Sequence, residues 1–249
     1  MNHLAIDTAT EILSVALRVE GTQARSYHEV RDEGLHHARL LMPIVDALLG
    51  RAGLQPHELD FVSCMRGPGS FTGLRIGMAT AKGIASAIAG VRGHPRLPLV
   101  SVPTLDVIAS ATDAGDGLVM PLLDARKGRY YAAVYSRGTR LTDDLDLEPR
   151  RLLRSARDLF TRVGTRRVLL CGPHVRGFMR ALGTGEQPED LELCEGPDYR
   201  GGYAISLLDQ ADRRMKATGY DLIDAGPLYV RRSDAELLRK ASLTQGVKR

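Results

Sequence analysis

The chain has 249 residues, of which 43% are hydrophobic and 26% are charged, as is typical of a folded soluble protein with a buried core. It contains no Trp and only 5% aromatic residues, so a surface that stacks nucleic-acid bases is poorly supplied. Three cysteines without CxxC spacing favour reduced thiols and argue against a disulfide framework or a zinc site. No run of 18 apolar residues and no signal-peptide pattern occur, so we expect a cytoplasmic protein without a membrane span.

The formal net charge of +4 is concentrated in the last residues of the sequence. Residues 231–249 carry six Lys or Arg and two acidic residues, which gives +4 for this segment and zero for residues 1–230. The segment is either a solvated tail or an electrostatic contact for RNA or another protein.

In chain order, short apolar runs first predict strands over residues 3–7, 12–20 and 23–31. Residues 12–20 alternate between apolar and polar side chains, which is typical of a half-buried strand, and Gly21-Thr22 predicts a hairpin turn after it. The next predicted elements are a helix over 36–51 that ends at Gly53, a strand over 59–65, a helix over 73–89, a strand over 99–102 and a helix from Pro103-Thr104.

The second half predicts strands over 118–124 and 130–135 around a tight turn at Arg126-Lys127-Gly128. A helix over 149–163, a strand over 168–171 and a short helix after Pro173 follow. The Gly-, Pro- and acid-rich stretch 183–202 predicts an irregular connection, and a helix over 203–218 and a short strand over 228–230 complete the pattern.

The helix over 73–89 carries small residues at every fourth position: Gly73, Gly77, Ala81, Ala85 and Ala89. Positions four apart lie nearly above each other on a helix, so these residues form a smooth ridge that another helix can approach closely. The approaching helix belongs either to the same lobe of this chain or to another protein.

The turn Gly67-Pro68-Gly69-Ser70-Phe71-Thr72-Gly73 is the most unusual stretch of the sequence. A glycine turn between a strand and a helix can hold phosphate through its backbone amides. However, Thr72 stands where a GxGxxG pattern needs Gly, and Leu74 follows Gly73 where a P-loop needs Lys. We therefore favour a fixed turn in which Ser70 or Thr72 caps the following helix.

Other common catalytic patterns find no support. His36-His37 lacks a second metal ligand three or four residues later, because positions 40 and 41 are both Leu. No Gly-x-Ser-x-Gly elbow is present, so a serine hydrolase is not indicated either.

Several motifs occur together in a fixed order: Leu4-Ala-Ile-Asp-Thr-Ala-Thr10, His37 six residues before Pro43, Arg66-Gly-Pro-Gly-Ser-Phe-Thr-Gly-Leu-Arg-Ile-Gly77, Ala81-Lys-Gly83, Asp124-Ala-Arg126, Tyr131 and Pro227-Leu-Tyr-Val-Arg231. With this set the sequence resembles the TsaB (YeaZ) family over almost its whole length. The run from Arg66 to Gly77 is highly specific, whereas the pieces around Asp7 and Asp124 are individually weak.

The resemblance implies an α/β fold of the actin-like (ASKHA) type with two lobes and a degenerate nucleotide pocket. We expect an N-terminal lobe of residues 1–102 plus about 203–232, a C-terminal lobe of 103–202 and a basic tail of 233–249. The resemblance also implies a place in the bacterial complex that makes threonylcarbamoyladenosine in tRNA.

The resemblance further implies partners and cofactors. The expected partners are a homologous TsaD-type catalytic subunit, a small TsaE-type ATPase and, when the chain is alone, a second copy in a homodimer; contact with tRNA is expected to be indirect or weak. No cofactor or metal of the chain's own is expected, with ATP and metal on the partner subunits or at the joint between subunits.

The family's dimerising surface lies on the two helices that correspond here to residues 36–51 and 73–89. The resemblance therefore favours the reading of the small-residue ridge as a partner interface. The expected partner-binding residues are His37, Leu41, Ile44, Gly67, Pro68, Gly69, Phe71, Thr72, Gly73, Arg75, Gly77 and Ala81.

Actin-like ATPases hold phosphate in two hairpins, in each of which glycine closely follows an acidic residue. Here Thr8 follows Asp7, and Ala125 and Arg126 follow Asp124, so neither hairpin has its glycine. We therefore expect these four positions (Asp7, Thr8, Asp124 and Arg126) to form a degenerate pocket and the chain to be a scaffold with no catalytic centre.

Two alternatives from other classes stay open. The first is an independent ATPase or small-molecule kinase that uses Asp7 and Asp124 in the cleft between the lobes. The second is a protease.

Overall fold

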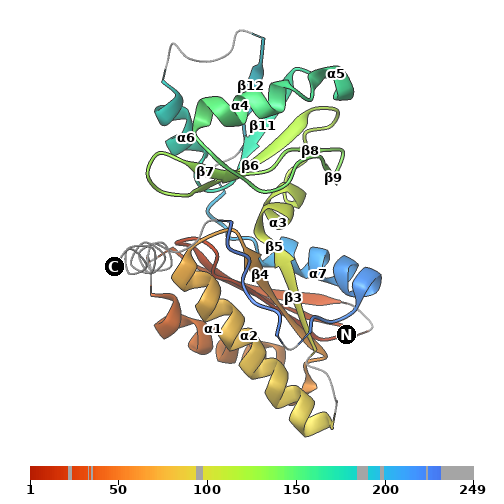
Figure 1. Cartoon of the computed structure of the whole chain (residues 1–249). Coiled ribbons are helices and arrows are strands. Elements are labelled where there is room, and N and C mark those ends of the chain that lie inside the picture. Colours follow the sequence, from red (N-terminus) through yellow and green to blue (C-terminus); the bar gives the residue numbers. More distant parts are fainter. Residues whose placement is uncertain are drawn as a thin grey trace, which may run out of the picture.

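The computed structural model describes residues 1–21, 24–32, 34, 36–93, 98–183, 190–196, 199–222 and 224–230, and these form two stacked α/β lobes (Figure 1). The N-terminal lobe holds a five-stranded sheet in the order β3-β2-β1-β4-β5. Pairing is antiparallel between β1, β2 and β3 and parallel between β1, β4 and β5. The strands are β1 (His3–Asp7), β2 (Leu13–Val19), β3 (Arg25–Arg31), β4 (Phe61–Gly67) and β5 (Leu99–Pro103).

Helices cover both faces of this sheet. On one face α1 (His37–Ala52) and α2 (Phe71–Arg92) form a core with the strands, and the 3-10 turn η1 (Pro56–Glu58) lies beside α2. On the other face α3 (Thr104–Ser110) and α7 (Ala204–Thr218) form a second core. Because of this double cover, five of the seven residues of β2 are buried, which corrects the expectation of a half-buried strand.

The ends of α1 and α2 confirm two sequence predictions. Gly53 follows α1 in a left-handed conformation with φ of 68°, and its N–H donates to the carbonyl of Gly50. Ser70 caps α2, where its hydroxyl accepts the N–H of Gly73 at 3.2 Å.

The C-terminal lobe holds the second sheet, in the order β10-β7-β6-β11-β12, with β8 and β9 attached beside β6. Its helices pack on one core cluster with the strands. The elements are β6 (Leu118–Asp124), β7 (Tyr130–Ala132), β8 (Tyr135–Ser136), β9 (Thr139–Arg140), β10 (Leu145–Leu147), α4 (Pro149–Arg157), α5 (Phe160–Val163), β11 (Arg167–Cys171), α6 (Val175–Leu182) and β12 (Glu192–Glu195). The predicted two-lobed α/β fold is confirmed.

Four expected segments differ in the structure. The strand expected over 130–135 is split into β7 and β8, which pair with different parts of β6, and the helix over 149–163 is split into α4 and α5. The expected irregular stretch contains β12, which extends the sheet as a parallel neighbour of β11. Residues 228–230 form no strand, because the described backbone there makes only a single bridge, from the N–H of Leu228 to the carbonyl of Arg66 at 2.7 Å.

The predicted basic tail, residues 233–249, lies outside the described residues. Among the residues that are described, no helix combines the length and the apolar character needed to cross a bilayer.

Candidate functional site

Asp7, the first carboxylate of the predicted pocket, lies at the end of β1 and is 1% exposed. Its Oδ1 accepts the N–H of Ala9 at 3.1 Å, and its Oδ2 accepts the hydroxyl of Ser14 at 3.3 Å and the N–H of Tyr203 at 3.1 Å. Burial raises the pKa of Asp7, and these hydrogen bonds oppose the rise. Both carboxylate oxygens therefore accept hydrogen bonds from the chain itself. These hydrogen bonds join the β1–β2 turn to the start of α7.

Thr8 lies directly under the first turns of α2. Its hydroxyl donates to the carbonyl of Gly73 at 2.8 Å. A Cβ on Gly73 would lie 2.0 Å from the carbonyl oxygen of Thr8, and a Cβ on Gly77 would lie 2.2 Å from the Thr8 hydroxyl. Only glycine permits this approach, so the glycine-rich run brings α2 against the chain's own β1–β2 turn.

The amides of the glycine-rich turn are also bonded within the chain. The N–H of Ser70 donates to the carbonyl of Ala9 at 2.7 Å, and the N–H of Gly67 donates to the hydroxyl of Thr104 at 3.2 Å. The Ser70 hydroxyl likewise accepts the N–H of Gly73. These three backbone N–H groups are therefore not available to bind a phosphate. The preferred reading of the motif as a fixed, capped turn agrees with this geometry.

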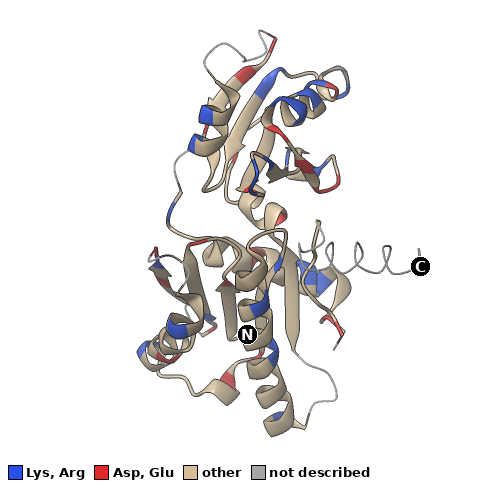
Figure 2. Ribbon diagram, turned by 60° about the vertical axis from the view of Figure 1, so that its left-hand side comes forward, with Lys and Arg blue, Asp and Glu red and all other residues tan. Residues whose placement is uncertain are grey.

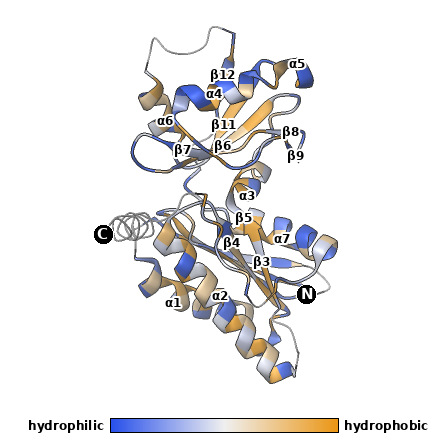
Figure 3. Cartoon of the chain, viewed as in Figure 1, coloured by the Kyte–Doolittle hydropathy of each residue, from blue (hydrophilic) through white to orange (hydrophobic). Residues whose placement is uncertain are grey.

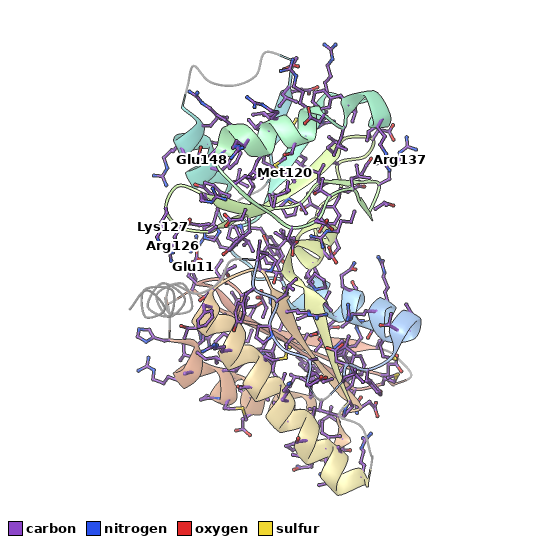
Figure 4. All side chains as sticks on the ribbon, in the orientation of Figure 1. Glu11, Met120, Arg126, Lys127, Arg137 and Glu148 are labelled. Carbon is purple, nitrogen blue, oxygen red and sulfur yellow. The ribbon has the colours of Figure 1, made fainter. Side chains whose placement is uncertain are left out.

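The second acidic hairpin connects β6 to β7. Asp124 is partly exposed, and its Oδ1 accepts the N–H of Arg126 at 2.7 Å. Arg126, Lys127 and Gly128 all have a left-handed backbone, with φ of 64°, 56° and 71°, which confirms the tight turn predicted there. Figure 4 shows Arg126 and Lys127 on the same side of the waist between the lobes as Glu11.

Glu11 and His174 connect the two lobes and were not anticipated from the sequence. His174 Nε2 lies 3.2 Å from Glu11 Oε2, and this hydrogen bond is the main reason that the pKa of Glu11 falls to about 2. Beside them, Arg200 forms a two-pronged ion pair with Asp32 at 2.5 and 2.7 Å. The sequence separates these partners too widely for any local pattern to show the contacts.

The structure places most of the predicted partner-binding residues in the core of the N-terminal lobe. Eight are buried by their own chain: His37, Leu41, Ile44, Gly67, Pro68, Gly73, Gly77 and Ala81. Gly69 is half-buried, and Phe71, Thr72 and Arg75 are exposed. The small-residue ridge of α2 thus faces inward, which corrects the expectation that its residues contact another protein directly.

The outward sides of α1 and α2 form an apolar groove together with η1. The groove has a volume of 650 Å³ and is lined by Met42, Pro56, His57, Thr80, Gly83, Ile84, Ala87, Ile88 and Val91. Met42 and Val91 are 49% and 71% exposed, which is unusual for large apolar side chains. Figure 3 shows hydrophobic residues in orange interspersed with polar ones along both helices.

Phe71, Arg75 and Tyr229 form an exposed cluster at the start of α2. The Arg75 guanidinium lies 3.9 Å from the centre of the Phe71 ring, and its Nε donates to the Tyr229 hydroxyl at 3.1 Å. The two rings are 4.8 Å apart. The cluster fastens the segment around Tyr229 to α2 and continues the exposed side of that helix.

The fold brings together a Ser, a His and an Asp side chain that no sequence motif predicts. His3 Nε2 lies 2.7 Å from the Ser63 hydroxyl, and His3 Nδ1 lies 3.0 Å from Asp212 Oδ1. However, Ser63 is 0% exposed and His3 1%, so a substrate does not reach them, and burial lowers the pKa of His3. The three side chains anchor α7 to β1 and β4.

Within the described parts of the chain, no group of three or more His, Cys, Asp or Glu side chains is placed to hold a metal ion.

Comparisons with known proteins find similarity to a TsaD family model and to TsaB proteins. A family model described as tRNA N6-adenosine threonylcarbamoyltransferase (TsaD) matches residues 32–149. The tRNA threonylcarbamoyladenosine biosynthesis protein TsaB of Bacillus subtilis is 34% identical over 135 residues, and TsaB of Escherichia coli is 37% identical over 139 residues. These alignments cover 54% and 55% of this chain and 55% and 56% of the relatives, so the chain spans about half the length of the curated relatives it matches.

A solved structure extends the likeness to the rest of the chain. YeaZ from Pseudomonas aeruginosa superposes with a TM-score of 0.68 at 26% identity, and covers 92% of this chain and 99% of its own. The similarity in structure therefore includes both lobes.

Proposed function

We propose that this chain is a member of the TsaB (YeaZ) family and a non-catalytic scaffold subunit of the complex that transfers threonylcarbamoyl to adenosine in tRNA. In this proposal its main partner is a TsaD-type catalytic subunit, and a TsaE-type ATPase joins the pair. ATP and metal are held on these partners or at the joint between subunits. The names of the relatives and the TsaD-type family model support this assignment.

The observation that carries the proposal is the apolar groove on α1, α2 and η1. Its exposed Met42 and Val91 gain stability from burial, and the small side chains of Gly83 and Ala87 let another helix approach closely. The buried ridge on the other side of α2 supports this surface by fixing the helix on the lobe. The groove is also where we expect two copies to pair when the partner is absent.

The inter-lobe cleft supports a scaffold better than an independent ATPase or kinase. Such an enzyme needs Asp7 open to a metal or to water, whereas Asp7 is 1% exposed and accepts three hydrogen bonds from the chain itself. The ATPase or kinase alternative uses two carboxylates, Asp7 and Asp124, and only Asp124 is accessible. We expect the isolated chain to give no ATP turnover with magnesium; turnover that disappears in Asp124→Asn would support the enzyme instead.

Ala87→Arg tests the groove. Ala87 is exposed and lines the groove, so the substitution should leave the fold intact and place a charge in the contact. We expect the Kd for the TsaD-type subunit, measured by titration calorimetry, to rise at least about tenfold, which corresponds to ~1.4 kcal/mol. Sedimentation of the isolated chain should show loss of the homodimer in the same variant.

Ala217→Arg is the matched control, because Ala217 is exposed on α7, on the opposite face of the sheet. It adds the same charge to a helix and should pair normally. Normal pairing of both variants would show that the groove is not the interface, and equal loss in both would show a general effect of charge.

A further inference from the structure

The C-terminal lobe carries a concentration of arginine that a scaffold held through its N-terminal lobe does not use. Residues 149–182 contain nine Arg, no Lys and a single acidic residue, Asp158. The zero net charge of residues 1–230 conceals this, because acidic residues elsewhere in the chain balance it. The segment comprises α4, α5, β11 and α6.

The helices α4 and α6 present these arginines on one outer layer. Leu152, Leu153 and Ala156 of α4 and Val175, Phe178 and Leu182 of α6 are buried in the same core cluster, and the two helices touch. Their opposite sides are therefore exposed together, and they carry Arg150, Arg151, Arg154, Arg157, Arg176 and Arg180. We call these six residues the arginine face; Figure 2 shows basic positions on both helices.

Part of the arginine face has no counter-charge among the residues that the structure describes. Arg157 pairs with Asp190 at 2.6 Å. Arg151, Arg154 and Arg180, in contrast, form no ion pair with any residue that the structure describes. Since a guanidinium stays charged at all physiological pH values, these three exposed positive charges are not neutralised by any acidic side chain among the described residues.

We propose that the arginine face binds the phosphate backbone of the tRNA. This inference rests on the proposed function and replaces the expectation that contact with tRNA is only indirect or weak. The planar guanidinium fork matches phosphate oxygens, and helix positions three or four apart place successive Cβ atoms ~5–6 Å from each other, so their arginines share one side of the helix. Because the chain is poor in aromatic residues, the contact positions the tRNA and does not read its bases.

The test uses the assembled complex of the full chain with its TsaD-type and TsaE-type partners. An unmodified tRNA transcript is titrated in fluorescence anisotropy at several salt concentrations, against the wild type and the triple variant Arg151→Gln, Arg154→Gln, Arg180→Gln. We expect the Kd to rise at least about tenfold at low salt, and the slope of log K against log salt to shrink by about one for each lost phosphate contact.

The matched control is the triple variant Arg137→Gln, Arg213→Gln, Lys216→Gln, which removes the same charge from exposed positions on β8–β9 and α7. It should change the Kd by less than about twofold. Equal loss in both variants, or no loss in the first, would overturn the inference. Loss of TsaE-type binding with unchanged tRNA affinity would also overturn it, because the face would then bind an acidic protein.

Assembly of the wild-type subunits is also measured without tRNA. If the subunits do not associate, the proposed scaffold function is wrong, whatever the result for the arginine face. The isolated chain is titrated with the same transcript as a second measurement. The same difference in salt slope between the two triple variants is expected there, and its absence would count against the arginine face whether or not a complex forms.

Discussion

The two faces of α2 carry the same kind of residue for opposite purposes. On the inner face, Gly73 and Gly77 lie so close to Thr8 that a side chain would collide with it. On the outer face, Gly83 has no atom within 4 Å of an added Cβ, and Ala79 and Ala87 are exposed beside it. Small residues at helical spacing therefore indicate a close approach, but they do not identify what approaches.

The largest effect is expected on the inner face. Gly77→Val should destabilise the chain by about 3 kcal/mol, because the new side chain overlaps the Thr8 hydroxyl, which is itself bonded to Gly73. Urea unfolding measures the loss. Combining Gly77→Ala with Thr8→Ala should cost at least ~1 kcal/mol less than the sum of the single changes, and strict additivity would contradict the collision.

The turn held by the inner face also carries Glu11, which gives a smaller effect that depends on pH. The pKa of Glu11 is lowered to about 2 in the folded chain, from an ordinary value of 4.5. Its contribution to stability is therefore full above pH 4.5 and is lost as the pH falls from 4.5 towards 2. Because the side chain is about a third exposed, we discount the contribution to about 1 kcal/mol.

Glu11→Gln should remove this part of the acid dependence. The measurement is the free energy of unfolding at roughly pH 6 and pH 3, which lie on either side of the ordinary pKa of a glutamate. Glu20→Gln is the control, since Glu20 is exposed and bonds only the N-terminus. Identical acid profiles for the wild type and Glu11→Gln would show that the contact between the lobes contributes nothing.

The smallest effect, of opposite sign, is expected on the outer face. Gly83→Ala should stabilise the chain by about 0.5–1 kcal/mol, because alanine favours a helix and its Cβ meets nothing there. For a chain of this size the melting temperature should rise by roughly 2–4 °C per kcal/mol. A lower melting temperature would mean that the outer face is packed and that the contrast between the two faces is wrong.

Local signals in the sequence predicted the long helices of the N-terminal lobe and two of their ends. Gly53 and Ser70 act on backbone groups only a few residues away, so their roles follow from neighbouring residues alone. The direction of the ridge could not be predicted in the same way, because the periodicity of α2 is compatible with small residues on either side. The ridge faces inward because Gly73 and Gly77 pack against Thr8. Only the folded chain brings these two segments together.

The candidate site could likewise be predicted only in part, because its contacts join segments that are distant in the sequence. The lack of glycine after Asp7 indicated a poor nucleotide pocket, but the bond from Tyr203 that closes it comes from the far end of the chain. Likewise, a net charge summed over the sequence hides the arginine face, because acidic and basic side chains cancel in a sum while they lie on different surfaces. Segment-by-segment charge along predicted helices is the signal that would have revealed it.

The position of α7 has a consequence for biosynthesis. This helix is among the last described elements to be translated, yet it packs against β1, the first. Until residues 204–218 have left the ribosome, one side of the first sheet, with Ala5, Ala16 and Val100, lacks the part of its cover that α7 supplies. A nascent or prematurely terminated chain therefore displays an apolar sheet surface to chaperones and proteases, although most of its strands are already made.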